Sequence, residues 1–540
     1  MTELQENLLG IHLSAMLVQK SGLSGHDRER FSLLIQSLVA ALDEGNSCLP
    51  VDRGDEVILR RTSLVSNGEK TPLVLYGACL YLHRYYHYEQ QLAYAIRQLA
   101  DREVEQLECG QVLDTAFGVA DKSGNLQRKS AQLAAGSALT LISGGPGTGK
   151  TTTVVRILGI LLSLLGTQIR IALAAPTGKA AMRLRQSVVG AVDGLVFAEE
   201  IRRSIPADAT TLHRLLGFRR NSVQFRHNRS NPLPYDVVVV DEASMVDLAL
   251  MSKLVDALAP TCRLILIGDK DQLTSVESGA VLSDLIQCFP DKTVVLKKSY
   301  RFDTAIKSLA EAVNSNDSAL AWSLLEGDSH EKLQLLGEKQ RDALYKGYGK
   351  YLEYAASCSP ERYTTIFTEF SRFRILCALR VGRYGVDTMN RQIEEYVMRR
   401  YGYEEEWYPG RPVMIGRNDY SLQLFNGDIG ICLLDPRDGL LKIWFEDGEG
   451  GLKSFLPFRL PQYQLAYAMT IHKSQGSEFD TVVIVLPDQD NPVLSRELLY
   501  TAITRGIEGV GISADKEVFV KALSRKTLRS SGLAAMLREK

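Results

Sequence analysis

Apolar residues recur along this chain with two different periods, and the changes between them divide it into segments. In Leu8–Val18 and Phe31–Leu42 they return every three or four residues, which is the spacing of one face of an α-helix. A β-like stretch follows at Leu73–Leu82, and another helical pattern runs to about Ala100. These patterns predict a separate, mostly helical N-terminal domain over residues 1–110.

From residue 111 onward, short β-branched apolar runs alternate with helical ones. This alternation is typical of parallel sheets covered by helices, so we expect an α/β fold with one such domain over 111–305 and a second over 306–540. The strands expected in the first domain are Ala138–Ile142, Ile169–Ala174, Asp236–Val240, Arg263–Ile267 and Thr293–Leu296. Those expected in the second are Tyr363–Thr368, Ile375–Leu379, Thr481–Leu486 and Val510–Ser513.

The second α/β domain is interrupted over residues 405–462. Short strands there are separated by the turn signals Asn426-Gly427-Asp428 and Asp447-Gly448. Such turns favour antiparallel hairpins, and the interruption is therefore predicted to be a small β-barrel insertion.

Composition places the chain among globular proteins. It has 540 residues, 45% of them hydrophobic, and no apolar run long enough to span a membrane. Glu3 and Glu6 occupy the region where a signal peptide would be basic, so a cytoplasmic location is expected. The eight cysteines form no CxxC pair, which argues against structural zinc, an iron–sulfur cluster or a disulfide framework.

Charge is balanced overall but not locally. The formal net charge is −1, which gives the whole chain no electrostatic preference for nucleic acid. Residues 178–230, however, carry ten lysines and arginines against four acids, a net of +6, with His213 and His227 among them. This segment is either a solvated face or a surface that binds a polyanion.

The segment Ser143–Thr153, SGGPGTGKTTT, carries the clearest chemistry in the sequence. Its spacing of Gly144, Gly149, Lys150 and Thr151 fits the phosphate-binding P-loop, and an expected strand and helix flank it in the required order. We therefore predict that a nucleoside triphosphate binds here with Mg²⁺. The residues expected to line the nucleotide are Gly144, Gly145, Pro146, Gly147, Thr148, Gly149, Lys150, Thr151 and Thr152.

Two acids end the apolar strand that reads VVVV, namely Asp241 and Glu242. In a P-loop sheet an acid at this place holds the Mg²⁺ and its water, so Asp241 is predicted to act with Thr151 as the metal pair. Glu242 is placed to polarise the attacking water, which would make the protein a hydrolase. The alternative is an ordinary exposed strand end.

Three further polar residues complete a hydrolytic set. Gln272 follows the expected strand at 263–267 and is a candidate sensor of the γ-phosphate. Arg301 and Arg505 are candidate arginine fingers, because an arginine that faces the γ-phosphate stabilises the charge of the transition state.

The order of these motifs resembles the superfamily-one helicases, and among them the family of RecD subunits of RecBCD enzymes (exodeoxyribonuclease V, alpha subunit). The resemblance covers roughly residues 70–535. Its further motifs are AAPTGKAAMRL at 174–184, TLHRLLG at 211–217, DEASM at 241–245, GDKDQL at 268–273, SYRF at 299–302, RPVMIGRND at 411–419, LFNGDIG at 424–430, TIHKSQGSEFD at 470–480 and YTAITR at 500–505.

The resemblance implies further roles. The two α/β domains would be RecA-like motors, the insertion an SH3-like barrel, and the N-terminal domain a partner interface. Gln127 would read the adenine edge and Tyr300 would stack on the base, since a π-face holds any purine. The residues implied in DNA contacts are Pro176, Thr177, Gly178, Lys179 and His213 in the first motor, and Thr470, His472, Gln475 and Glu478 in the second.

The resemblance also implies an ATP-dependent helicase that travels 5′ to 3′ on single-stranded or double-stranded DNA, in a heterotrimer with RecB and RecC, in double-strand break repair and homologous recombination. No nuclease site is expected in this chain, and cleavage would belong to a partner. Two alternatives stay open: a free-standing helicase of the same family, or a nucleotide-switched interaction protein without motor activity.

Overall fold

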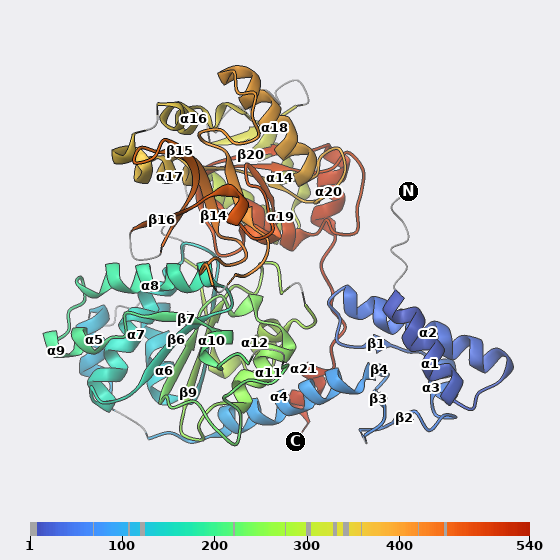
Figure 1. Cartoon of the computed structure of the whole chain (residues 1–540). Coiled ribbons are helices and arrows are strands. Elements are labelled where there is room, and N and C mark those ends of the chain that lie inside the picture. Colours follow the sequence, from blue (N-terminus) through green and yellow to red (C-terminus); the bar gives the residue numbers. More distant parts are fainter. Residues whose placement is uncertain are drawn as a thin grey trace. The chain divides into compact units, whose positions relative to one another are not determined.

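The computed structural model describes residues 8–68, 70–105, 108–118, 125–219, 222–275, 277–298, 304–327, 332–337, 345–357, 359–419, 421–447 and 451–539. The chain forms two compact units (Figure 1). Unit 1 comprises Met1–Lys270, Thr274–Lys298 and Leu528–Lys540, and unit 2 comprises Asp271–Leu273 and Ser299–Thr527. The short piece Asp271–Leu273 thus belongs to unit 2, although the chain on both sides of it belongs to unit 1.

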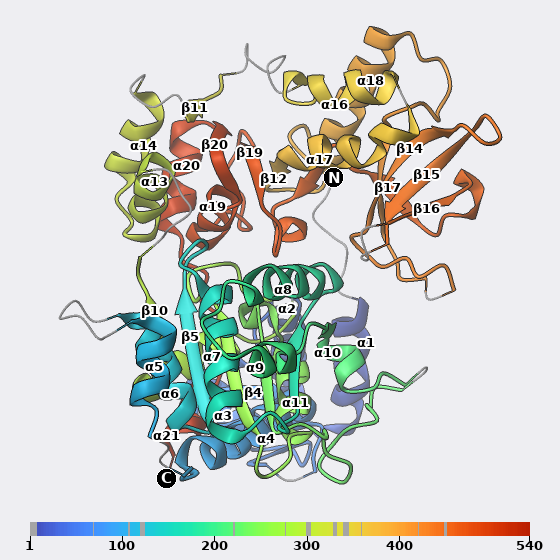
Figure 2. The same cartoon turned by 90° about the vertical axis from the view of Figure 1, so that its left-hand side faces the viewer.

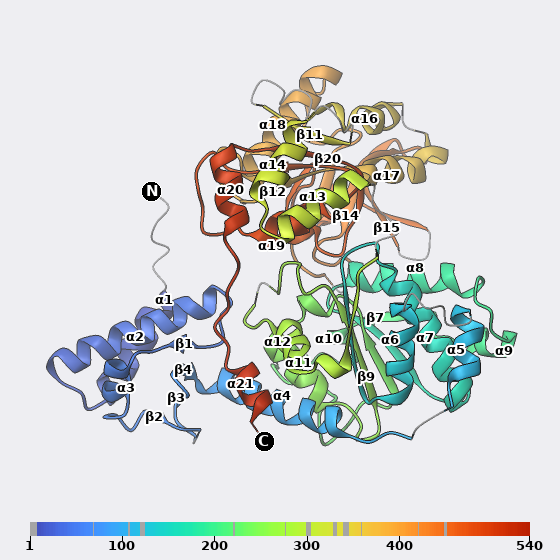
Figure 3. The same cartoon turned by 180° about the vertical axis from the view of Figure 1, so that it is seen from behind.

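The N-terminal part of unit 1 is helical with one small sheet (Figure 3). Its helices are α1 (Leu8–Lys20), α2 (Gly25–Asp43), α3 (Arg53–Leu59) and α4 (His83–Asp101). Its sheet has the order β1-β4-β3-β2, formed by Leu49–Pro50, Cys79–Leu82, Leu73–Tyr76 and Val65–Ser66. Phe31, Ile35 and Leu38 of α2 pack with Leu73 and Leu80 of this sheet in one core, which confirms the helical periods read from the sequence.

The rest of unit 1 is built on a six-stranded parallel sheet of order β10-β5-β9-β8-β6-β7. Every residue of β8 is buried, because Val238 and Val240 face one layer of helices while Val237 and Val239 face the other. Continuous apolar runs are therefore what this sheet requires, and they made its central strands predictable. The strands are β5 (Leu139–Gly144), β6 (Ile171–Ala175), β7 (Ala209–Thr211), β8 (Val237–Val240), β9 (Arg263–Gly268) and β10 (Thr293–Leu296).

Two layers of helices cover this sheet (Figure 2). One layer holds α5 (Gly110–Phe117), α6 (Leu126–Gly136), α7 (Lys150–Leu165) and α8 (Gly178–Val192), with α9 (Glu199–Ser204) beside them. The other holds α4, α11 (Leu248–Asp256), α12 (Val281–Cys288) and α21 (Leu533–Arg538). The short α10 (Leu212–Leu215) follows β7.

Unit 2 contains a second parallel sheet, of order β11-β20-β19-β12-β18. Its strands are β11 (Leu333–Leu335), β12 (Phe373–Cys377), β18 (Ala468–Thr470), β19 (Phe479–Val485) and β20 (Gly506–Ser513). One face packs on α13 (Thr304–Asn314), α14 (Ser318–Glu326), α19 (Arg496–Ile503) and α20 (Lys516–Ser524), and the other on α16 (Gly349–Ala356), α17 (Tyr363–Arg372) and α18 (Val386–Tyr401). The predicted α/β class is confirmed.

The strand expected at 363–368 is wrong, because these residues begin helix α17. The β-branched run Thr364-Thr365-Ile366 suggested a strand by propensity. The buried side chains Tyr363, Ile366, Phe367 and Phe370 are instead spaced three and four residues apart, so one helical face enters the core. Tertiary burial of that face outweighs the local preference.

The insertion is an antiparallel sheet of order β16-β15-β14-β13-β17. Val413, Cys432 and Phe445 form a core on one face of this sheet, whereas the alternate positions Ile431, Leu433 and Trp444 are buried in the core that also contains α16, α17 and α18. The expected turn at Asn426–Asp428 lies before β14, whereas Gly448 of the other expected turn lies outside the described residues. The strands are β13 (Pro412–Ile415), β14 (Ile429–Asp435), β15 (Leu440–Glu446), β16 (Leu452–Phe455) and β17 (Tyr463–Leu465).

The C-terminal tail, defined here as Leu528–Glu539, returns to unit 1, where α21 packs against α4 and α12 (Figures 1 and 3). The fully buried Glu89 of α4 anchors it, since the Glu89 carboxylate accepts hydrogen bonds from the Ser531 hydroxyl and the Gly532 backbone N–H. Ser47 and Tyr81 donate to the same carboxylate. Burial raises the pKa of Glu89, and these hydrogen bonds act in the opposite direction.

No helix in the described part of the chain is both long and apolar enough to cross a membrane. The seven cysteines within the described residues are all free thiols.

Candidate nucleotide and DNA sites

The P-loop connects β5 to α7, as the sequence predicted. Lys150 opens α7, and its ammonium donates to the backbone carbonyls of Gly144 at 2.6 Å and Gly145 at 3.1 Å. The Thr148 hydroxyl closes the loop on the Gly145 carbonyl at 2.8 Å. This strand, loop and helix order directs the first amides of a 16-residue helix into the loop, which is the geometry that holds phosphate.

Gln127 lies against this loop. Its side-chain amide on α6 is 3.5 Å from the Thr148 carbonyl oxygen. Gly149 has φ +77°, and a Cβ built there would lie 2.6 Å from the Gln127 amide nitrogen. The position therefore favours glycine because of its left-handed backbone conformation, while a Cβ there would meet only the flexible end of the Gln127 side chain.

Asp241 and Glu242 follow β8 and lie near Lys150. The pKa of Asp241 is raised to about 6, mainly by burial and then by the like charge of Glu242, whereas the charge of Lys150 acts in the opposite direction. Glu242 has φ +51°, one of the few non-glycine residues in the described chain with a left-handed backbone. Such a conformation costs of order 1 kcal/mol, and strained residues of this kind cluster at functional sites. Its amide donates to the Asp241 carboxylate at 2.9 Å.

These residues provide a donor set that fits Mg²⁺. Asp241 offers carboxylate oxygen and Thr151, in the first turn of α7, offers a hydroxyl, and Mg²⁺ is held in phosphate sites by few protein oxygens together with substrate and water. Among the described residues no group of three or more His, Cys, Asp and Glu side chains could hold a metal by itself.

Gln272 and Arg505 meet inside unit 2. The Arg505 guanidinium donates to the Gln272 side-chain oxygen at 2.7 Å, and also to the carbonyls of Ser477 and Thr501. Both side chains are almost fully buried, at 4% exposure for Gln272 and 2% for Arg505. The structure therefore joins two of the predicted residues across 233 positions of sequence.

Two more contacts hold the backbone beside Gln272. The Leu273 N–H donates to the Thr501 hydroxyl at 2.9 Å, and the Gln475 amide donates to the Leu273 carbonyl at 2.8 Å. Thr501 was not among the residues predicted from the sequence. Its place inside the motif YTAITR could have marked it as a candidate site residue. Tyr300 and Arg301, the predicted stacking residue and second finger candidate, lie outside the described residues.

The residues predicted to grip DNA in the first domain follow β6 and β7. Thr177 caps α8, since its hydroxyl accepts from the Ala180 amide at 3.2 Å, and it places Gly178 and Lys179 on the exposed first turn. His213 lies in α10, directly after β7. Because these strands are parallel neighbours, both segments emerge at the sheet edge that also carries the P-loop and Asp241.

His213 is part of a small aromatic and cationic cluster. Its ring packs edge-on against Phe225 at 5.7 Å, and Lys253 lies over Phe225 at 5.4 Å. Desolvation lowers the pKa of His213, Lys253 lowers it as well, and Asp247 acts the other way. These effects favour a neutral imidazole at pH 7, which can donate one hydrogen bond without carrying charge.

Two of the four acids of residues 178–230 form ion pairs with arginines of the same segment. Arg185 pairs with Asp208 at 3.6 Å, and Arg203 pairs with Glu199 one helical turn away. Both acids are already counted in the net charge of +6, so these pairs leave that excess unchanged.

In unit 2 the expected DNA segment begins at the end of β18. Thr470 ends that strand and His472 opens a short 3₁₀ turn, with both side chains partly exposed. Gln475, by contrast, is 7% exposed, and its side-chain amide donates to the Leu273 carbonyl. Glu478 is partly exposed immediately before β19.

Comparisons with known proteins match two parts of the chain to family models. Residues 127–278 match the AAA domain and residues 465–512 match the UvrD-like helicase C-terminal domain. The first match contains the P-loop, and the chain binds nucleotide.

Relatives match over most of their length. The protein named RecBCD enzyme subunit RecD from Mycolicibacterium smegmatis is 41% identical over 484 residues, which cover 87% of this chain and 84% of that one. The protein of the same name from Mycobacterium tuberculosis is 36% identical over 547 residues, covering 95% and 92%. Among solved structures, Bacteroides Pif1 bound to single-stranded DNA has a TM-score of 0.40 and 17% identity, covering 74% of this chain and 94% of that one. Identity and coverage of the two sequence relatives show the family, and the chain belongs to the RecD subunits of RecBCD enzymes.

Proposed function

We propose that the chain is the ATP-driven motor subunit of a RecBCD-type helicase–nuclease, moving 5′ to 3′ along DNA in double-strand break repair and homologous recombination. The observation that carries the proposal is the shared edge of the unit 1 sheet. The P-loop follows β5, the two acids follow β8, and the proposed DNA-binding segments follow β6 and β7, all at that one edge. A bound nucleotide and a bound DNA strand would therefore lie close enough to influence each other. The near full-length match to RecD subunits supports it.

ATP hydrolysis is assigned to the residues already described. Lys150 neutralises the β- and γ-phosphates, and Thr151 and Asp241 hold Mg²⁺, which when bound offsets the charge of the phosphate oxygens. Glu242 orients and polarises the attacking water, Gln272 senses the γ-phosphate, and Arg505 stabilises the transition-state charge. Gln127 reads the adenine, and Tyr300 stacks on it.

We propose that ATP hydrolysis moves the DNA strand by changing the DNA contacts made by residues that follow strands of the two parallel sheets. Thr177, Lys179 and His213 hold the DNA backbone on unit 1, and Thr470 and His472 hold it on unit 2. Opening and closing of the two motors on ATP would let one set hold while the other releases. The Gln475 contact to Leu273 supports this coupling, because it ties the segment that follows His472 to the backbone beside Gln272.

The direction of travel is tested by unwinding of 5′-tailed and 3′-tailed duplexes by the full chain, with and without RecB-type and RecC-type subunits. We expect the chain to unwind 5′-tailed duplexes preferentially and to hydrolyse ATP faster when single-stranded DNA is added. Lys150→Gln should lower DNA-stimulated ATP hydrolysis at least about 100-fold, because a positioned charge at the phosphates is lost.

The result that would reject the polarity is a preference for 3′ tails. Hydrolysis retained by Lys150→Gln would reject the motor assignment as a whole. ATP turnover without any translocation on single-stranded DNA would instead favour a nucleotide-switched interaction protein.

We further propose RecB-type and RecC-type chains as partners, in the cytoplasm, with cleavage assigned to a partner chain. The exposed apolar residues of α1 and α2 support a partner contact, because Leu9 is 68% exposed and four further apolar side chains on these two helices are exposed. These are Leu8, Ile11, Met16 and Leu33.

Substitution of Leu9 checks this interface. Leu9→Asp should lower co-purification with the two partner chains at least about 10-fold, because a charge is placed in an apolar contact. Leu320→Asp is the matched control, since Leu320 is a 46% exposed leucine on α14 of unit 2. Equal recovery of the partners with both variants would contradict the assignment of this face.

A further inference from the structure

The loop that follows Gln272 is held by the C-terminal tail, which is not part of the six-stranded parallel sheet of unit 1. We define the post-Gln272 loop as Thr274, Ser275 and Glu277–Gly279, all in unit 1. The Arg529 guanidinium of the C-terminal tail donates to its backbone carbonyls at Ser275, at Glu277 (2.8 Å) and at Gly279 (2.9 Å). One cationic group thus satisfies three acceptors of a loop 250 residues earlier in the chain.

The end of α2 supports the same arrangement. The Ser278 hydroxyl donates to the Leu42 carbonyl at 3.4 Å, and the Gly279 N–H donates to the Gly45 carbonyl at 3.0 Å. Gly45 has φ +86°, and a Cβ there would lie 2.7 Å from the Arg529 guanidinium. A larger residue at this position would displace the arginine, so the N-terminal helices provide the space in which Arg529 sits.

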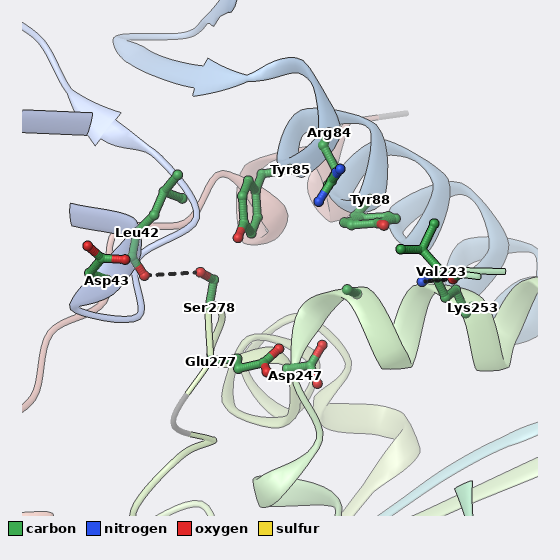
Figure 4. A pocket seen from close by; sticks show the side chains of 11 residues that line it. Leu42, Asp43, Arg84, Tyr85, Tyr88, Val223, Asp247, Lys253, Glu277 and Ser278 are labelled. Carbon is green, nitrogen blue, oxygen red and sulfur yellow. Dashed lines mark hydrogen bonds between the residues drawn. The ribbon is translucent and has the colours of Figure 1, made fainter. Parts of the chain in front are cut away.

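Part of the loop borders a cavity of about 430 Å³, which is also lined by residues of α4, α11 and the end of α2 (Figure 4). Glu277 and Ser278 border it, together with Tyr85, Tyr88 and Asp247. The Leu248 N–H also donates to the Ser278 carbonyl at 3.0 Å, so the loop is held by this hydrogen bond together with those to Arg529, Leu42 and Gly45.

The loop is close in sequence to the proposed catalytic set. Ser275 is three residues after Gln272, a span of at most about 11 Å of extended chain. Gln272 and Leu273 are themselves held in unit 2 by Arg505, Thr501 and Gln475. A displacement of the loop must therefore be absorbed by very few backbone torsions next to Gln272.

We propose that Arg529 is a positioning residue for ATP hydrolysis, which holds the post-Gln272 loop so that Gln272 keeps its place. The inference rests on the proposed role of Gln272 at the γ-phosphate. It makes the C-terminal tail and the N-terminal helices part of the hydrolytic apparatus, although neither contributes a residue to the P-loop site.

The test compares Arg529→Ala with Arg102→Ala in the full chain. Arg102 is a close match, because it also donates to three backbone carbonyls, those of Pro260, Thr261 and Cys262, but at the amino end of β9. We expect Arg529→Ala to lower kcat for DNA-stimulated ATP hydrolysis about 10-fold with KM for ATP within about twofold, since misplacement by 1 Å can cost up to about 100-fold. Arg102→Ala should change kcat less than twofold at a similar loss of melting temperature, and Arg529→Lys should recover part of the kcat.

Hydrogen exchange gives a readout that does not depend on activity. Amides of the post-Gln272 loop should exchange at least about 10-fold faster in Arg529→Ala than in wild type, and not in Arg102→Ala. An unchanged kcat in Arg529→Ala, or an equal fall in both variants, would overturn the inference. If wild type shows no DNA-stimulated hydrolysis, the proposed function fails, and the exchange measurement still decides whether Arg529 holds the loop.

If Arg529→Ala does not fold, Ser278→Ala tests the same inference with a smaller change. Ser278→Ala removes only the hydrogen bond to the Leu42 carbonyl and should lower kcat in the same direction by about two- to threefold. No change in kcat with a folded Ser278→Ala and a folded Arg529→Lys would reject the positioning role.

Discussion

An Arg505→Lys protein is expected to hydrolyse ATP about 10³-fold more slowly than wild type in the presence of single-stranded DNA. A transition-state arginine contributes about 10³- to 10⁵-fold to such reactions, and lysine keeps the charge but lacks the planar fork that contacts several oxygens at once. In this chain the fork also binds Gln272 and two backbone carbonyls, which a single ammonium cannot reproduce. Single-turnover hydrolysis of ATP measures the loss directly.

The matched control is Arg374→Lys. Arg374 is another buried arginine of unit 2, at 1% exposure, and it donates to the carbonyls of Ala466 and Phe370. We expect Arg374→Lys to lower the free energy of unfolding but to change kcat less than about threefold. Arg505→Lys that keeps more than a tenth of wild-type kcat would show that Arg505 is structural.

A double-mutant cycle with Gln272→Ala separates two ways in which Arg505 can act. If Arg505 works through Gln272, the double variant is no slower than the slower single variant. If Arg505 contacts the phosphate independently, the two losses multiply.

Glu242→Gln is expected to lower kcat about 10²- to 10⁴-fold while the affinity for ATP changes less than about threefold. Glutamine fills the same space at φ +51° but cannot accept a proton from the attacking water. Binding of a fluorescent ATP analogue and single-turnover hydrolysis measure the two quantities separately.

Asp236→Asn provides the control for Glu242. Asp236 immediately precedes β8, at the amino end of the strand that Asp241 and Glu242 follow, and it accepts from the Arg170 amide at 2.7 Å. The same loss of one negative charge there should leave kcat within about twofold. A comparable fall in both variants, or weak ATP binding by Glu242→Gln, would argue against Glu242 as the base.

Much of the fold could be read from local patterns. The strands around the P-loop and at Val237–Val240 were predictable because burial on both faces demands continuous apolar runs, and α7 because its loop fixes where the helix begins. The pattern was insufficient at Tyr363–Arg372, where β-branched residues sit in a helix whose buried face is visible only once the core is known.

Some residues of the candidate site could also be identified from the sequence, whereas others could be recognised only in the structure. Lys150, Asp241 and Glu242 were identifiable because each follows a recognisable strand, and the position after a parallel strand places a residue at the ligand edge. The hydrogen bonds of Thr501 to the Leu273 N–H and of Gln475 to the Leu273 carbonyl left no periodic signal, since they join segments more than 200 residues apart.

The sequence by itself determined that this chain is an α/β nucleotide-binding protein, because phosphate binding and strand burial impose local residue patterns, while its superfamily-one helicase type was indicated only by the resemblance of its motif series to that family. Only the tertiary structure decided that Arg505 meets Gln272, and that the C-terminal tail holds the loop beyond it. Hydrogen bonds between distant segments depend on the packing of whole elements, so no local stretch of sequence contains them.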